Sequence, residues 1–235
     1  MLYYKKCGNP EGKLVLFIHG GFTDSSSFIK QCDILRDYQC VFVDLPGHGK
    51  SDFGQCYHFD YETAAHELIK LIELLSPCEK IYIISHSYGG LVAKLIMSEI
   101  PHKIKGIVIG STNLKRTPLF YMYTSIIGCI YLWLVNNKRY KRDNISWQLV
   151  FDTQKSAWKQ FAVNNTDRFD DIPCILLYAQ YDVRDIQESM LIWKNILKNS
   201  KLIQLKNTGH NYFYDSYGKV NKIIEKFISD QENFT

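Results

Sequence analysis

Short, mostly apolar runs alternate along the chain with longer segments in which apolar residues recur every three or four positions. The runs occupy residues 14–18, 40–43, 81–84, 104–109, 174–178 and 201–205, and residues 1–6 are typical of an edge strand. The helical period is clearest at residues 61–75 and 220–228. Strands that alternate with helices predict an α/β fold, with a mostly parallel central sheet and helices on both of its faces.

One stretch, residues 113–169, interrupts this alternation and contains no convincing strand. It holds 9 Lys and Arg against 3 Asp and Glu, a net charge of +6, whereas the rest of the chain carries 19 against 21. Aromatic residues also concentrate there. We therefore predict a core in two parts, residues 1–112 and 170–235, separated by an insertion at 113–169.

A candidate nucleophile, Ser87, stands where the apolar run 81–84 meets the small residues Gly89 and Gly90. A serine on a strand-to-helix turn is held in a strained backbone conformation that exposes its Oγ. The N–H of the next residue, Tyr88, can then point at a developing oxyanion. Ser85 replaces the first glycine of the G-x-S-x-G pattern, and its side chain is small enough for such a turn.

The run 14–18 ends in a glycine pair, within His19-Gly20-Gly21-Phe22. Acyl transfer needs two N–H donors for the tetrahedral oxyanion, and a loop after a neighbouring strand can bring the second one. We expect this donor to be the N–H of Gly21, with Phe22 as the alternative.

A candidate base and a candidate acid follow two later strands. Asp182 comes after the run 174–178, and His210 comes after the run 201–205. Asp185 follows the same strand as Asp182 and is an alternative acid. His86 adjoins Ser87 in sequence and is an alternative base, but neighbours on a sharp turn point apart, which favours His210.

The order Ser87, Asp182, His210, with the serine turn and the glycine loop, resembles the α/β-hydrolase superfamily. The resemblance spans nearly the whole sequence. It implies a serine hydrolase in which Ser87 attacks a carbonyl, His210 moves the proton, and Asp182, early in its loop, orients the imidazole. Gly21 and Tyr88 would form the oxyanion hole. The insertion 113–169 would be the helical cap of this family.

The resemblance also narrows the chemistry. A serine nucleophile forms an acyl-enzyme, whereas the haloalkane and epoxide hydrolases of this superfamily use a carboxylate. We therefore expect hydrolysis of a carboxylic ester-type bond in a small, partly hydrophobic substrate. Thioesterase, lactonase and carbon–carbon bond hydrolase activities remain open, as does a ligand receptor without turnover. We expect the pocket to be lined by the aromatic residues Phe22, Tyr121, Trp133 and Trp147, and the basic insertion to favour a negatively charged part of the substrate.

Composition adds several exclusions. The chain has 235 residues, 46% of them hydrophobic, and its net charge is +4, which is ordinary for a globular domain. It lacks nucleotide-binding glycine motifs, and its seven cysteines form no C-x-x-C pair, so we expect no cofactor, metal or disulfide framework. The expected partner is a small-molecule acyl substrate and not a nucleic acid, and oligomeric state stays open.

Residues 1–6 lack the apolar core of a signal peptide, which predicts a cytoplasmic protein.

An apolar run at residues 119–135 is flanked on both sides by basic residues. It is shorter than the roughly 20 residues that a membrane-spanning helix needs, and spanning would separate the two halves of the sheet. Two further interpretations are peripheral contact of the cap with a membrane surface and cap helices packed over the pocket. The last of these is the preferred interpretation.

Overall fold

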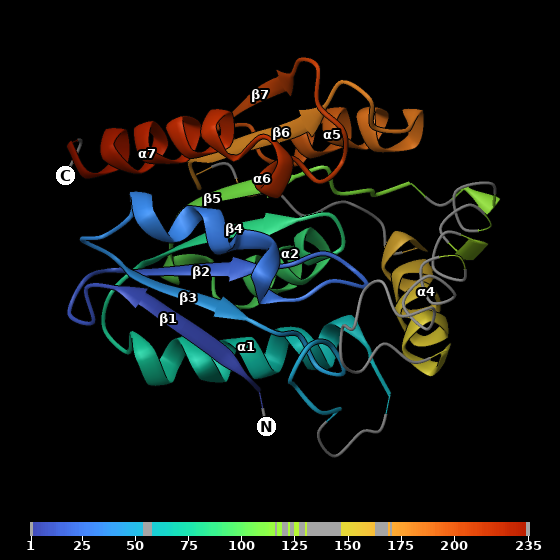
Figure 1. Cartoon of the computed structure of the whole chain (residues 1–235), viewed down its shortest axis with the longest axis horizontal. Helices are drawn as coiled ribbons and strands as arrows, with labels where there is room; N and C mark the ends of the chain where they lie inside the picture. The colour runs from blue at the N-terminus through green and yellow to red at the C-terminus, as the bar shows by residue number, and fades with distance from the viewer. Residues whose placement is uncertain are drawn as a thin grey trace.

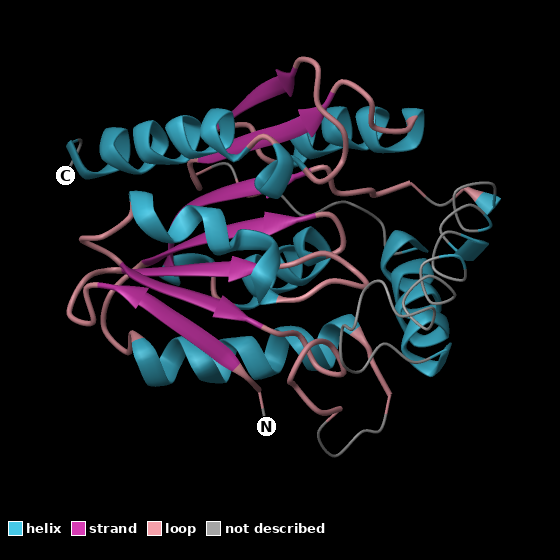
Figure 2. Cartoon of the chain, viewed as in Figure 1, coloured by secondary structure: helices cyan, strands magenta, loops and turns pink. Residues whose placement is uncertain are grey.

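A computed structural model of the chain describes residues 2–53, 58–115, 147–162 and 171–233, together with positions 117, 118, 122, 125, 126, 130 and 169. Its centre is a seven-stranded sheet in the order β1-β3-β2-β4-β5-β6-β7 (Figures 1 and 2). The strands are β1 (Tyr4–Gly8), β2 (Leu14–Ile18), β3 (Gln39–Val43), β4 (Ile81–His86), β5 (Ile104–Gly110), β6 (Cys174–Ala179) and β7 (Ser200–Leu205). Among the strands of the described residues, only the edge strand β1 pairs antiparallel, with β3. The predicted mostly parallel sheet is confirmed.

Helices cover both faces of this sheet, as the alternation predicts. The helical elements are η1 (Ser25–Ile34), α1 (Tyr61–Leu75), α2 (Gly89–Glu99), η3 (Pro101–Lys103), α4 (Trp147–Ala162), α5 (Arg184–Ile196), α6 (Tyr212–Asp215) and α7 (Tyr217–Asn233). Side chains of α1, α2 and α5 build the core on one face, and those of η1, α6 and α7 build the core on the other. The strands are therefore apolar on both sides, which explains why they appear in the sequence as continuous apolar runs.

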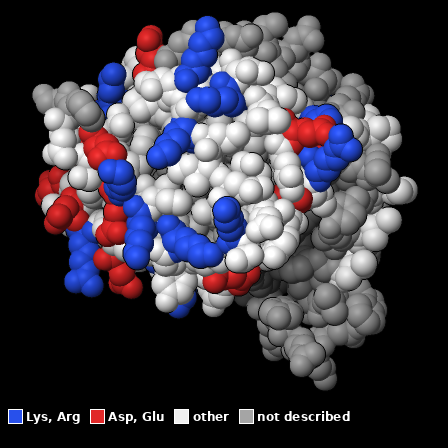
Figure 3. All heavy atoms as spheres, turned by 90° about the horizontal axis from the view of Figure 1, so that it is seen from above, with Lys and Arg blue, Asp and Glu red and all other residues white. Residues whose placement is uncertain are grey.

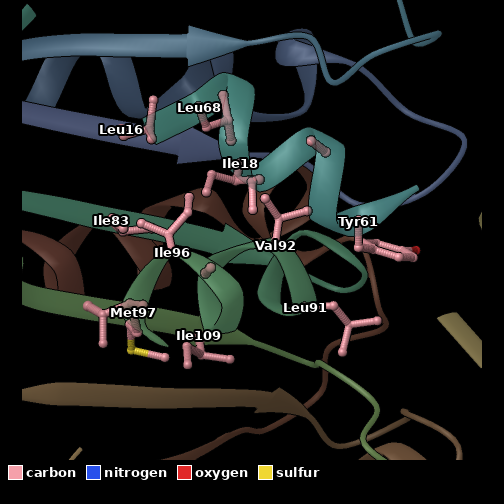
Figure 4. Close-up of a cluster of buried hydrophobic side chains, with 14 of the residues drawn as sticks. Leu16, Ile18, Tyr61, Leu68, Ile83, Leu91, Val92, Ile96, Met97 and Ile109 are labelled. Atoms are coloured by element: carbon pink, nitrogen blue, oxygen red, sulfur yellow. The ribbon is translucent and has the colours of Figure 1, made fainter. Parts of the chain in front are cut away.

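In the core between the sheet and helices α1, α2 and α5, the apolar residues that recur every three or four positions face the strands. Ile18 and Ile83 project from neighbouring strands towards Val92 of α2 and Leu68 of α1 (Figure 4). All four side chains are fully buried. Burial of each such side chain contributes about 1.5–3 kcal/mol relative to leaving it exposed. Helix α1 begins at a defined point because the Asp60 side chain accepts the N–H of Thr63 at 2.9 Å.

One cysteine expectation is wrong. The structure joins Cys7 of β1 to Cys32 of η1 by a disulfide, with the two Cα atoms 6.2 Å apart. The sequence holds no signal for this pair, because the two residues meet only when η1 packs beside the edge strand β1. Cys40 and Cys174 lie buried in strands with free thiols.

The surface near the β7 edge carries charges of both signs. Figure 3 shows this face from above, with basic and acidic side chains interspersed. Lys201 stands on β7 itself, and a charged side chain on an edge strand discourages pairing with another chain. Among the described residues, no helix has the length and apolar character needed to cross a membrane.

Candidate active site

Ser87 occupies a sharp turn between β4 and α2. Its φ is +52°, a left-handed conformation that costs a non-glycine residue on the order of 1–3 kcal/mol. Two backbone hydrogen bonds hold the turn: the N–H of Ser87 donates to the carbonyl of Gly110 at 2.7 Å, and the Ser87 carbonyl accepts the N–H of Gly90 at 3.0 Å. The serine therefore lies at the carboxyl edge of the sheet, where open parallel sheets bind their ligands.

Close packing beneath this turn depends on small residues. A Cβ at Gly89 would stand 2.4 Å from the carbonyl oxygen of Ile18, so only glycine lets α2 start so near the end of β2. Ser85, which replaces the usual first glycine, is fully buried and donates its hydroxyl to the carbonyl of Val108 at 3.2 Å. The hydrogen bond satisfies the buried hydroxyl, which explains how serine is tolerated there.

The structure brings Ser87, His210 and Asp182 into one hydrogen-bonded row. His210 Nε2 lies 3.0 Å from Ser87 Oγ, and His210 Nδ1 lies 2.7 Å from Asp182 Oδ1. An ionised carboxylate only accepts hydrogen bonds, so Nδ1 carries the ring proton. The lone pair of Nε2 then faces the hydroxyl of Ser87, which is the arrangement needed for proton transfer from the serine.

Asp182 is held by several donors in a buried position. Its Oδ2 accepts the Ser111 hydroxyl at 2.6 Å and the N–H of Ala179 at 2.7 Å. Burial by itself raises the pKa of the Asp182 carboxyl, but the hydrogen bond and charge of His210, with the Ser111 and Ala179 bonds, outweigh it and lower this pKa. Asp182 is therefore an anion at neutral pH.

The alternative acid, Asp185, and the alternative base, His86, make other hydrogen bonds. Asp185 accepts a hydrogen bond from the hydroxyl of Thr117. His86 Nε2 lies 2.9 Å from the backbone carbonyl of His210, so Nε2 is the protonated nitrogen and donates to that carbonyl. Burial, with the nearby His210 ring, lowers the pKa of His86 to about 3. His86 is thus a neutral ring that supports the loop carrying His210.

The glycine loop packs directly against the serine turn. His19 Nε2 accepts the N–H of Leu45 at 2.9 Å, so its Nδ1–H donates to the carbonyl of Gly20 at 2.7 Å. These bonds tie the loop to the chain that follows β3. A Cβ at Gly21 would stand 2.5 Å from Cδ2 of the Tyr88 ring. The absence of a side chain at Gly21 therefore lets its backbone approach the residue that follows Ser87.

The expected aromatic lining is described only in part. Phe22 is half-buried beside Gly21 and has a φ of +61°. Trp147 is the first residue of α4, and its side chain, like Tyr121 and Trp133, lies outside the described residues. Most of residues 113–146 lie outside them too, so the domain boundaries and the contact of residues 119–135 stay predictions. Helix α4 itself lies beyond the carboxyl ends of the strands (Figure 1).

Two parts of this site had no signal in the sequence. Ser111 follows β5 at a position that offers no acid, and only the folded chain shows its hydroxyl on Asp182. The support that His86 gives to His210 is equally non-local, because 124 residues separate them. Within the described part of the chain, no group of three or more His, Cys, Asp or Glu residues is arranged to hold a metal ion.

Known proteins similar to this chain include hydrolases from several organisms. Residues 13–125 match the family described as alpha/beta hydrolase fold. An uncharacterized hydrolase, YugF of Bacillus subtilis, is 27% identical over 135 residues, which is 52% of this chain and 49% of that protein. A serine hydrolase-like protein of Danio rerio is 31% identical over 124 residues, covering 51% of this chain and 37% of that protein.

Solved structures extend the likeness to the whole chain. A thermophilic esterase from Thermogutta terrifontis has a TM-score of 0.76 and 18% identity, covering 98% of this chain and 93% of that one. The chain spans about half, or less, of the length of the curated relatives that it matches. The family match over residues 13–125, these hydrolase relatives and the shared architecture identify an α/β-hydrolase fold in this chain.

Proposed function

We propose that this protein is a serine hydrolase that cleaves a carboxylic ester-type bond of a small, partly hydrophobic substrate through an acyl-enzyme on Ser87. The observation that carries the proposal is the row of three side chains, in which His210 lies 3.0 Å from Ser87 Oγ and 2.7 Å from Asp182 Oδ1. Serine hydroxyls are weak nucleophiles unless an adjacent base removes the proton, and this geometry supplies that base.

The reaction would proceed in two halves. Ser87 Oγ attacks the substrate carbonyl while its proton passes to His210 Nε2, and the imidazolium then gives this proton to the leaving oxygen. Water then loses a proton to the same nitrogen and attacks the acyl carbon; the bond from this carbon to Ser87 Oγ breaks, the imidazolium returns its proton to Oγ, and the acid is released. Asp182 stays ionised throughout, holds the Nδ1–H tautomer and stabilises the positive ring.

The backbone N–H groups of Tyr88 and Gly21 are the proposed oxyanion donors. Tyr88 immediately precedes α2, where the helix dipole is positive and favours a developing negative charge. Gly21, in the loop that follows β2, lies close to the Tyr88 ring, so the two proposed donors belong to neighbouring loops. Loss of one such donor typically costs about 3 kcal/mol of transition-state stabilisation. Phe22 remains the alternative to Gly21.

A fluorophosphonate probe tests the proposal directly, because it reacts preferentially with an activated serine. We expect labelling of the full chain, no labelling of Ser87→Ala, and strongly slowed labelling of His210→Ala. Ser98→Ala is a matched control, since its hydroxyl bonds a carbonyl of its own helix and lies away from the row. Labelling that survives in Ser87→Ala, or no labelling of the unaltered protein, would contradict the assignment.

The substrate class is then read from a panel of p-nitrophenyl esters, acyl thioesters and lactones. We expect the esters to give the highest kcat/KM. A clear preference for thioesters or lactones would move the activity to one of those neighbouring classes. Binding without turnover would instead support a ligand receptor.

A further inference from the structure

The buried face of α4 carries more polar side chains than a helix packed on a core needs. Its described buried positions are Leu149, Val150, Thr153, Gln154, Ser156, Ala157 and Gln160. Four of these seven are polar. A polar group out of water lowers stability unless it is hydrogen-bonded, so each of the four requires a partner.

Three of the four polar side chains hold α4 to the rest of the site. Ser156 Oγ accepts the backbone N–H of Tyr61 at 3.0 Å, and Gln160 donates to Glu62 at 2.8 Å. Gln154 Oε1 accepts the hydroxyl of Tyr88 at 3.2 Å. Helix α4 is therefore fixed both to the start of α1 and to the residue that follows the nucleophile.

Thr153 differs from the other three. It is fully buried, and none of the described residues gives its Oγ1 a hydrogen-bond partner. Its methyl carbon lies 3.6 Å from the point where a Cβ on Gly21 would stand, and a carbon of the Tyr88 ring lies 2.5 Å from the same point. Thr153 thus belongs to the immediate surroundings of the proposed oxyanion loop.

Tyr61 is a second buried residue of this kind. Its ring centroid lies 6.1 Å from that of Tyr88, and in the described part of the chain its hydroxyl has no hydrogen-bond partner. Figure 4 shows the Tyr61 side chain extending past the first turn of α1, on the side of the strand ends where Figure 1 places α4. Burial, with the Tyr88 phenol nearby, raises the pKa of Tyr61, so its hydroxyl stays protonated.

We propose that the hydroxyls of Tyr61 and Thr153 form a polar subsite that recognises an uncharged hydrogen-bonding group, a hydroxyl or a carbonyl, on the substrate. The inference rests on the proposed function and specifies its substrate class. Both hydroxyls can donate and accept. An ionised group does not fit this subsite, because two neutral hydroxyls do not compensate the burial of a charge.

Two pairs of isosteric esters test the subsite and locate it. The first pair, p-nitrophenyl 3-hydroxybutyrate and p-nitrophenyl 3-methylbutyrate, differs only in the acyl part. The second pair, 2-hydroxypropyl butyrate and isobutyl butyrate, differs only in the alcohol part. We expect the hydroxyl member to have a kcat/KM about tenfold or more above its methyl partner in one of the pairs. Tyr61→Phe with Thr153→Val should abolish that preference, whereas Tyr217→Phe, on the surface, should retain it.

Stability supplies an independent readout. Removing a buried hydroxyl that has no partner should stabilise the free protein, so Tyr61→Phe and Thr153→Val should each raise Tm by roughly 2–4 °C. A lowered Tm together with an unchanged ester preference would mean that the hydroxyls serve the fold, and would overturn the subsite.

Binding to Ser87→Ala separates this proposal from the proposed function. Isothermal titration calorimetry with the same four esters measures the preference without chemistry. Hydrolysis that proceeds with no preference in either pair, in kcat/KM or in binding, would overturn the subsite alone. A binding preference that depends on Tyr61 and Thr153, in a protein that neither reacts with the fluorophosphonate nor hydrolyses any ester, would support the subsite and remove the proposed function.

Discussion

The hydrogen bond from Ser111 to Asp182 gives a prediction whose size follows from the structure. Ser111 Oγ lies 2.6 Å from Asp182 Oδ2 and 3.1 Å from the hydroxyl of Tyr212. Because the carboxylate only accepts, the Ser111 proton goes to Asp182, and Tyr212 donates its single proton to the carbonyl of Leu177 at 3.2 Å. Ser111→Ala therefore removes one donor from a buried anion and leaves Tyr212 with a partner.

A hydrogen bond to a charged group typically contributes about 1.5–3 kcal/mol, so we expect Ser111→Ala to lower the free energy of unfolding by that amount at pH 7. The folded-state pKa of Asp182 is depressed. Its stabilisation is therefore fully present above the pKa of the unfolded chain, about 3.9, and is lost as pH falls through the folded-state pKa. The difference between the two proteins should be constant from pH 8 to about pH 5 and shrink below that.

Urea denaturation at a series of pH values measures this effect, with Ser98→Ala as the control. The Ser98 hydroxyl bonds a carbonyl of its own helix, so its removal should cost less than about 0.5 kcal/mol at every pH. A loss for Ser111→Ala that does not change between pH 8 and pH 3 would refute the reasoning, because the effect would then not depend on the charge of Asp182. A loss no larger than that of the control would refute it too.

Three further predictions concern the row and the loops around it. Asp182→Asn should lower kcat by about 10⁴-fold, whereas Asp185→Asn should lower it less than tenfold in the same ester assay; the reverse order would transfer the acid role. Gly21→Ala places a methyl 2.5 Å from Cδ2 of the Tyr88 ring, which displaces the loop. We therefore expect kcat to fall about 10²–10³-fold with little change in KM. An unchanged kcat would exclude Gly21 as a donor. His86→Phe leaves the carbonyl of His210 without its donor. It should lower the free energy of unfolding, measured by urea denaturation, by about 1–3 kcal/mol and should slow fluorophosphonate labelling. Labelling at the original rate would show that His86 is not needed to position His210.

The sequence alone determined the layer arrangement of the protein. Continuous apolar runs such as residues 14–18 and 81–84 are buried on both faces, and their alternation with helical stripes predicts a parallel sheet covered on both sides. The strand-to-helix turn at Ser87 could also be predicted from adjacent residues, because this serine stands between a β-branched apolar run and two glycines. His210 and Asp182 each follow a strand in the sequence. They are therefore expected at the carboxyl edge of the parallel sheet, where ligands bind.

Only the tertiary structure decided which side chains surround those groups. Ser111 meets Asp182 across 71 residues, and His86 meets the carbonyl of His210 across 124. Contacts of this kind depend on the register of neighbouring strands and on the packing of one loop against another, and neither leaves a period or a motif in the sequence. The same is true of Cys7 and Cys32, whose pairing requires η1 to lie beside the edge strand. Secondary-structure propensity depends on neighbouring residues and can be recognised in the sequence. A hydrogen bond between distant residues forms only once the chain has folded.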